Sequence, residues 1–215
     1  FFGPAVNAAR AIAVQLESAI AQFSTNFLMA VNPQITKLYA QNNLPEMHKL
    51  LFRASKFAFF LLYALSLPVI IETNTILTIW LKVVPDYTVI FLHLLLAIVI
   101  IDSVARPLMT AAASTGDVKL YQSLIGGILL SIVPIAYVVL KLGGSPESVY
   151  IVHLVICIIA FLTRLFVVRP KIRLSLRKYF LIVINPCITS YVIGLTRNER
   201  QFVHMKCVEM IRKIH

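Results

Sequence analysis

The longest uncharged stretch of this chain, residues 120–140, is 21 residues long. An α-helix rises about 1.5 Å per residue, so about 20 apolar residues cross a hydrocarbon core of roughly 30 Å. The composition agrees, because 59% of the residues are hydrophobic and only 13% are charged, whereas a soluble domain carries about 25% charged residues. The mean hydropathy is +0.85. The sequence therefore predicts an integral membrane protein and excludes a water-soluble fold.

Five spanning helices are predicted from the positions of the charged residues and prolines. They cover about residues 5–31, 57–71, 87–116, 120–140 and 148–168. The first is expected to end at Asn32-Pro33, because the residue before a proline is pushed out of helical geometry. Pro107 and Pro134 are expected to bend the third and fourth spans, since a proline removes one helical hydrogen bond. A short interfacial helix around Trp80 is expected between the second and third spans.

A sixth uncharged run, residues 179–196, carries Asn185-Pro186 at its middle. We therefore expect an all-α, polytopic transmembrane helix bundle of five spans over residues 1–178. Residues 179–196 would form an ambiguous or truncated sixth span, and residues 197–215 a basic C-terminal tail. The chain opens without an initiator methionine or a signal peptide, as expected for a piece of a longer protein.

The Lys and Arg residues of the short loops predict the orientation, because cytoplasmic loops collect them. The two loops expected to be cytoplasmic carry Lys37, Lys49, Arg53 and Lys56, and then Arg164, Arg169, Lys171, Arg173, Arg177 and Lys178. The intervening connections have only Lys82 and Lys141 as cations, which suits the outer side. A single crossing by residues 179–196 would place the basic tail outside, against the rule. That run is either re-entrant or interfacial, or it has lost a partner helix.

The first span has an unusually polar face. On a helical wheel at 100° per residue, one broad arc holds Asn7, Arg10, Gln15, Glu17, Ser18, Gln22, Ser24, Thr25 and Asn26. Ionisable groups at membrane depth usually face a bundle interior or a water-filled cavity. We therefore expect this arc to line a cavity, with a stretched ion pair between Arg10 and Glu17 as one option. The alternative is an amphipathic helix lying on the membrane surface.

Asp102 and Arg106 form a second charged group, on the third span. Their i, i+4 spacing, with the acid nearer the N-terminus, suits an ion pair along one helix face. A coupling or gating role is one interpretation. The other is plain anchoring at the cytoplasmic headgroups, because Gly116 follows Pro107 by only nine residues.

The sequence contains no phosphate loop, metal-ligand cluster or catalytic triad. We therefore expect no enzymatic activity, no metal and no cofactor. The net charge of +11 lies in membrane-flanking segments, where topology and anionic lipids explain it better than nucleic acid does. A membrane-embedded polysaccharide polymerase or ligase remains as an enzymatic alternative, but it would need a sizeable outer loop with catalytic Arg or His residues.

The chain resembles the second half of bacterial polysaccharide flippases, which belong to one superfamily with the multidrug and toxin extrusion transporters. The resemblance covers roughly residues 1–178 and starts from a polar first helix that closes in Asn32-Pro33-Gln34-Ile35-Thr36-Lys37. The other matching stretches are residues 1–10, 48–60, 80–82, 85–88, 107–112 and 115–116. The end departs from the family pattern, since residues 179–202 look like the start of one helix joined to the end of the next.

The resemblance implies about one six-helix lobe of a transporter that works by alternating access in the bacterial inner membrane. Its expected substrate is a polyprenyl-pyrophosphate-linked oligosaccharide for capsule, O-antigen or exopolysaccharide synthesis, and its expected partners are membrane lipids and an N-terminal lobe. Arg10 would contact the anion, and Asn7, Gln15, Gln22 and Asn26 the sugars, while Glu17, Asp102 and Arg106 would couple or gate. The alternative within the superfamily is a cation-coupled multidrug exporter, in which Glu17 and Asp102 would matter more than Arg10.

Overall fold

The computed structural model describes residues 2–185, and in these residues the chain is helical with no strand. The helices are α1 (Pro4–Ala40), α2 (Leu44–Ile71), α3 (Thr73–Leu81), α4 (Thr88–Ser114), α5 (Lys119–Leu130), α6 (Ile132–Lys141), α7 (Ser148–Ile172) and α8 (Leu176–Tyr179), followed by a π-helical segment, Phe180–Ile184. The expected all-α bundle is confirmed. Residues 186–215, with most of the sixth run and the basic tail, lie outside the described residues.

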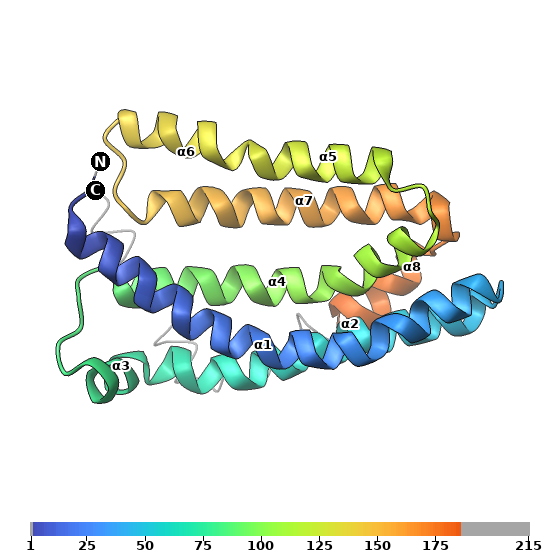
Figure 1. Ribbon diagram of the computed structural model, residues 1–215, viewed down its shortest axis with the longest axis horizontal. Helices are drawn as coiled ribbons and strands as arrows, with labels where there is room; N and C mark the ends of the chain where they lie inside the picture. Colours follow the sequence, from blue (N-terminus) through green and yellow to red (C-terminus); the bar gives the residue numbers. More distant parts are fainter. Residues whose placement is uncertain (1, 186–215) are drawn as a thin grey trace.

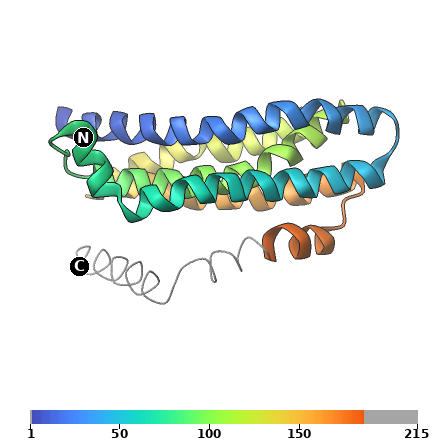
Figure 2. The ribbon, with the colours of Figure 1, turned by 90° about the horizontal axis from the view of Figure 1, so that it is seen from below.

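The long helices lie side by side along one axis, and α4 is central among them (Figure 1). It packs against α1, α2 and α7, whereas α5 and α6 pack mainly against α7. The view from below shows α1 and α2 on neighbouring sides of the bundle, with α3 at one end (Figure 2). The bundle is therefore built outward from α4, and α1 covers one side of it.

Four helical stretches are long and apolar enough to cross a membrane: α2, α4, the α5–α6 pair and α7. Their length and composition make this a membrane protein. α1 has 37 residues, but the polar residues of its exposed face keep it from matching the apolar character of these four. The expected first span is thus present as a helix, but this helix is more polar than the four candidate membrane spans.

Two predicted helix boundaries are wrong. α1 does not end at Asn32-Pro33 but continues to Ala40, because packing holds the segment after the proline: the Ile35 side chain is fully buried. α2 begins at Leu44, well before residue 57, where the Asn43 side chain accepts a hydrogen bond from the Glu46 amide. Tertiary packing overrides the helix-ending tendency of a proline where neighbouring helices satisfy the freed groups.

The predicted fourth span is divided into α5 and α6 at Ser131. Pro134 has no N–H, so the carbonyl of Leu130 loses its helical donor. Ser131 lies three residues before Pro134, and its hydroxyl donates to the Ile128 carbonyl at 2.6 Å. The bend expected from Pro134 therefore occurs as a break three residues before it. By contrast, α3 (Thr73–Leu81) agrees with the predicted short helix, and Trp80 on it is exposed.

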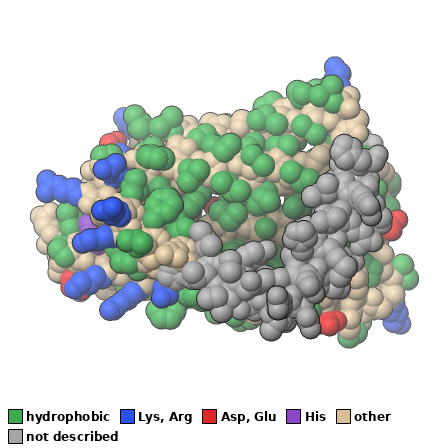
Figure 3. All heavy atoms as spheres, turned by 180° about the vertical axis from the view of Figure 1, so that it is seen from behind, with side chains coloured by type: hydrophobic (Ala, Val, Ile, Leu, Met, Phe, Trp, Pro, Cys, Tyr) green, Lys and Arg blue, Asp and Glu red, His purple; other side chains and the backbone are tan. Residues whose placement is uncertain are grey.

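Cations gather at one end of the bundle (Figure 3). This end is formed by the last turns of α1, the first turns of α2, the start of α5, the end of α7, and α8. It carries Lys37, Lys49, Arg53, Lys119, Arg169, Lys171, Arg173, Arg177 and Lys178. In the described part of the chain, the connections at the other end carry Lys82 and Lys141. The loops expected to be cytoplasmic thus share one end of the molecule.

This asymmetry predicts that the cation-rich end is cytoplasmic. In a chain whose native cysteines are replaced by alanine, Lys49→Cys should be protected from a membrane-impermeant maleimide in intact cells and become labelled after permeabilisation. The matched control, Lys82→Cys, lies at the opposite end and should be labelled in intact cells. Labelling of Lys49→Cys without permeabilisation would reverse the orientation.

Candidate functional site

The polar face of α1 is exposed. Five of the predicted site residues lie on it, all with exposed side chains: Asn7, Arg10, Gln15, Gln22 and Asn26. The opposite side of the helix carries the buried residues Ala9, Ala13, Ile20, Ser24 and Leu28. We call the five exposed residues the α1 polar stripe. The broad arc expected from the helical wheel is thus divided. Ser24 and the half-buried Thr25 turn toward the bundle, Gln15, Gln22 and Asn26 face away from it, and Arg10 lies at its edge beside Tyr150 of α7.

The α1 polar stripe extends over the full depth of a hydrocarbon core. Asn7 and Asn26 are 19 positions apart, which corresponds to about 28 Å of helix, and the core is roughly 30 Å thick. Amide and guanidinium groups along such a length would be expensive to expose to lipid. The stripe therefore needs water, a ligand or another polypeptide in front of it.

The side chains of the stripe differ in the hydrogen bonds and ion pairs that they form. The Gln22 side-chain amide donates to the Asn26 carboxamide oxygen at 2.8 Å along the same face. The Arg10 guanidinium neighbours the phenol of Tyr150 on α7, but the Tyr150 hydroxyl has no hydrogen-bond partner of ordinary geometry. No ion pair joins Arg10 to Glu17 among the described residues. The Arg10 charge is therefore available to an anion.

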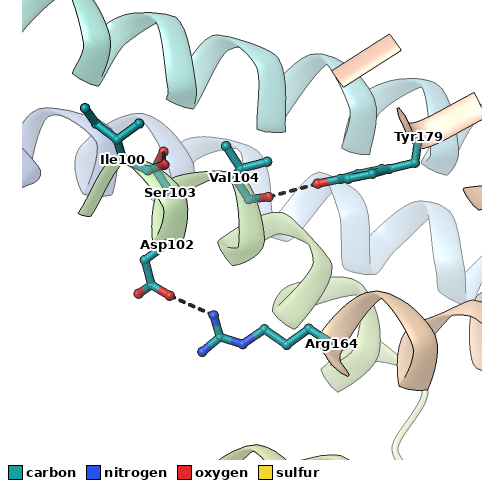
Figure 4. Close-up of polar contacts among 6 residues, drawn as sticks. All are labelled: Ile100, Asp102, Ser103, Val104, Arg164 and Tyr179. Atoms are coloured by element: carbon teal, nitrogen blue, oxygen red, sulfur yellow. Dashed lines mark hydrogen bonds and ion pairs between the residues drawn. The ribbon is translucent and has the colours of Figure 1, made fainter. Parts of the chain in front are cut away.

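Asp102 forms an ion pair with Arg164 of α7, with 2.7 Å between Oδ1 and Nη1 (Figure 4). The sequence prediction of a pair between Asp102 and Arg106 is therefore wrong. The Arg164 side chain is only 4% exposed, and that of Asp102 is 35% exposed. Asp102 lies 14 positions from Thr88 and 12 from Ser114, or about 21 and 18 Å from the ends of α4. At that depth, headgroup anchoring does not account for Asp102.

Arg106 instead joins α4 to α1. Its Nη1 donates to the Thr25 hydroxyl at 2.8 Å. Two further bonds continue toward the cation-rich end: the Thr110 hydroxyl donates to the Asn32 side chain at 3.0 Å, and the Ser114 hydroxyl donates to the Thr36 hydroxyl at 3.1 Å. These three bonds, which we call the α1–α4 ladder, fix the rotation of α1 about its axis. They thereby decide which residues of α1 face outward.

Glu17 is a further acid within the bundle. It is half-buried, accepts a hydrogen bond from the Ser18 hydroxyl at 3.3 Å, and is attracted by Arg106. Together with Asp102 and Arg164 these groups comprise two acids and two bases, so their formal charges cancel. The compensated charges hold the helices together, whereas Arg10 on the stripe is an additional cation.

Two parts of this arrangement were not predicted. Arg164 was placed near the end of the fifth span and counted with the basic loop, and its pairing with Asp102 was missed, although an arginine within an apolar helix usually pairs with an intramembrane acid. The α1–α4 ladder could have been suspected from Arg106, Thr110 and Ser114, which recur every four residues and so share one face of α4.

Among the described residues, no group of three His, Cys, Asp or Glu side chains could hold a metal ion. No protein-family model matches the chain, and neither the curated proteins nor the solved structures contain a match to it. A function for this chain is therefore inferred from its residues and their geometry.

The ion pair predicts a large effect of removing one partner. Asp102→Ala leaves the Arg164 charge buried without its counter-ion, which should destabilise the fold by about 3–5 kcal/mol. Thermal unfolding in detergent micelles measures the loss. Asp117→Asn is the matched control. It weakens the pair with Lys171, in which the Asp117 carboxylate is 73% exposed, and it should change stability by less than about 1 kcal/mol because Lys171 keeps its bond to the Asp117 carbonyl.

A double substitution distinguishes the cost of an unpaired buried charge from the cost of lost side-chain packing. Asp102→Leu with Arg164→Met removes both charges together and should be much less destabilising than Asp102→Ala alone, since buried pairs are often replaceable by apolar residues. Equal, small losses for Asp102→Ala and Asp117→Asn would contradict the role given to this pair.

Proposed function

We propose that this chain is one lobe of a membrane transporter that moves a lipid-linked oligosaccharide across the bacterial inner membrane. The observation that carries the proposal is the α1 polar stripe, five exposed polar side chains that are spread over a length of helix equal to the thickness of the hydrocarbon core. Exposed apolar residues, Phe23 and Met29 among them, lie between these side chains. A polar surface at that depth is useful where a hydrophilic substrate must cross. The resemblance of residues 1–178 to polysaccharide flippases supplies the substrate class.

The chemistry of the stripe suits a sugar attached to a pyrophosphate. Carboxamides of Asn7, Gln15, Gln22 and Asn26 offer both donors and acceptors, which match the hydroxyl groups of a glycan. The guanidinium of Arg10 can bind a phosphate through two parallel hydrogen bonds. The polyprenyl tail of such a substrate can stay in the bilayer while the head follows the stripe.

Transport by this route requires a second lobe. Many transporters bind substrate near the midplane between two repeats and work by rocking one repeat against the other. A partner lobe opposite α1 would exclude lipid from the stripe and close the passage. The α1–α4 ladder and the Asp102–Arg164 pair tie α1, α4 and α7 together, as a lobe that moves as a rigid body requires.

A cation-coupled drug exporter is the competing function, and it would use Glu17 and Asp102 as an ion site. Asp102 already has Arg164 as its counter-ion at 2.7 Å, which leaves little negative charge for a transported cation. The exposed Arg10 also suits an anionic substrate better than a cationic drug. Both observations favour the flippase.

Arg10→Ala in the full-length protein should reduce glycan export at least tenfold while the protein stays at its normal level in the membrane, because one charge-assisted bidentate contact contributes about 1.5–3 kcal/mol. Export is measured as surface polysaccharide in cells that depend on this transporter. Lys141→Ala, which removes an exposed cation at the same end of the bundle, is the matched control. Parental export by Arg10→Ala would remove Arg10 from the substrate path, and loss of drug resistance in place of export would favour the exporter.

A further inference from the structure

A pocket of about 540 Å³ lies at the C-terminal end of α7, away from the α1 polar stripe. It is lined by Phe166, Arg169, Pro170, Arg173 and Leu174. The pocket belongs to the cation-rich end of the bundle. It is a shallow hollow that is open to its surroundings, because four of its five lining residues are exposed.

The two arginines of the pocket have no acidic partner in the described part of the chain. Both side chains are exposed, and neither forms an ion pair there. Lys171, between them in sequence, behaves differently because it bonds to the Asp117 carboxylate at 2.6 Å. Within residues 2–185, the pocket thus has two guanidinium groups that lack an acidic counter-ion.

The backbone at Arg173 is in the left-handed region, with φ 53° and ψ 41°. This residue ends α7, and the following amide, of Leu174, bonds to the Arg169 carbonyl at 3.0 Å. Glycine is the usual residue at such a position, because any side chain adds roughly 1–2 kcal/mol of strain there. Asn42, Lys82 and Tyr87 also have positive φ, so this conformation by itself marks the end of a helix and not a site.

The apolar part of the pocket lies on the membrane side of the arginines. Phe166 is one turn before Arg169 and is 64% exposed, although it is on a helix apolar enough to span the membrane. Leu174 closes the other side and is buried. The arginines lie at the level of the headgroups and the exposed aromatic ring lies below them. This arrangement is complementary to a phospholipid, whose phosphate lies at the membrane surface and whose acyl chains lie below it.

We propose that this pocket binds the phosphate headgroup of an anionic phospholipid in the cytoplasmic leaflet. Arg169 and Arg173 hold the phosphate, Phe166 packs against the first acyl carbons, and the bound lipid sets the depth of α7 in the membrane. The site is independent of the transported substrate and of the α1 polar stripe.

Tryptophan fluorescence in vesicles tests this site directly. The protein has a single tryptophan, Trp80, at the end of the bundle opposite the pocket. In the full chain carrying Trp80→Phe and Phe166→Trp, brominated phosphatidylglycerol should quench the pocket tryptophan at lower mole fraction than brominated phosphatidylcholine. Each arginine should contribute about fivefold to this preference, since one direct hydrogen bond to the phosphate contributes about 1 kcal/mol net.

Arg173→Gly is the decisive variant, because glycine keeps the left-handed backbone and removes only the side chain. It should lower the preference for phosphatidylglycerol about fivefold, whereas Arg177→Gln, which removes an exposed cation of α8 at the same end, should leave it unchanged. Equal loss in both variants would mean general surface attraction and overturn the site. Equal quenching by the two lipids would overturn it too.

Two further measurements complete the test. Inorganic phosphate at 10-fold excess over the accessible lipid should not relieve quenching by phosphatidylglycerol, and relief would assign the pocket to a soluble anion instead of a lipid. Native mass spectrometry of the unsubstituted chain with phosphatidylglycerol guards against a misfolded Phe166→Trp reporter. It should detect a bound lipid that Arg173→Gly retains less well than Arg177→Gln, and no difference between the two variants would contradict the proposal.

Discussion

The hydrocarbon core of a membrane contains no water, so each polar group within it needs a partner inside the protein. α4 supplies most of these partners. It pairs Asp102 with Arg164 and donates from Arg106 to Thr25. Its Val104 carbonyl accepts from the hydroxyls of Ser55 and Tyr179, the latter drawn in Figure 4. Helices from four parts of the chain are thereby fixed against one helix.

The polar side chains on the outer face of α1 do not receive such partners from α4. The α1–α4 ladder holds Thr25 inward and leaves Gln15, Gln22 and Asn26 exposed, while Arg10 lies beside Tyr150 of α7. Phe23 and Met29 of α1 are exposed as well, whereas the exposed side of α7 carries apolar residues such as Ile158 and Phe166. The same bonds that stabilise the bundle thus leave polar side chains of α1 exposed, which is why we propose a second lobe and a hydrophilic passage between the two.

Much of the fold follows from the sequence, because crossing a membrane constrains length and composition directly. The expected spans 87–116 and 148–168 differ from α4 and α7 by only a few residues. The helical-wheel analysis of residues 5–31 also identified the residues of the α1 polar stripe. The end of α1 was mispredicted because packing around Ile35 outweighs Pro33, a balance that local rules do not contain. The partner of Asp102 was missed because it lies on another helix, whose placement no single-helix pattern specifies.

Water access along α1 shows whether the α1 polar stripe lines an aqueous passage. In the full-length protein without other cysteines, single cysteines along α1 are treated in the membrane with a small, water-soluble thiol reagent. The account predicts reaction at Gln15→Cys and Gln22→Cys, and none at the buried Ala13→Cys and Ile20→Cys or at the lipid-facing control Ile158→Cys on α7. If Gln15→Cys and Gln22→Cys are as unreactive as Ile158→Cys, the stripe does not line a water-filled passage and the account is wrong.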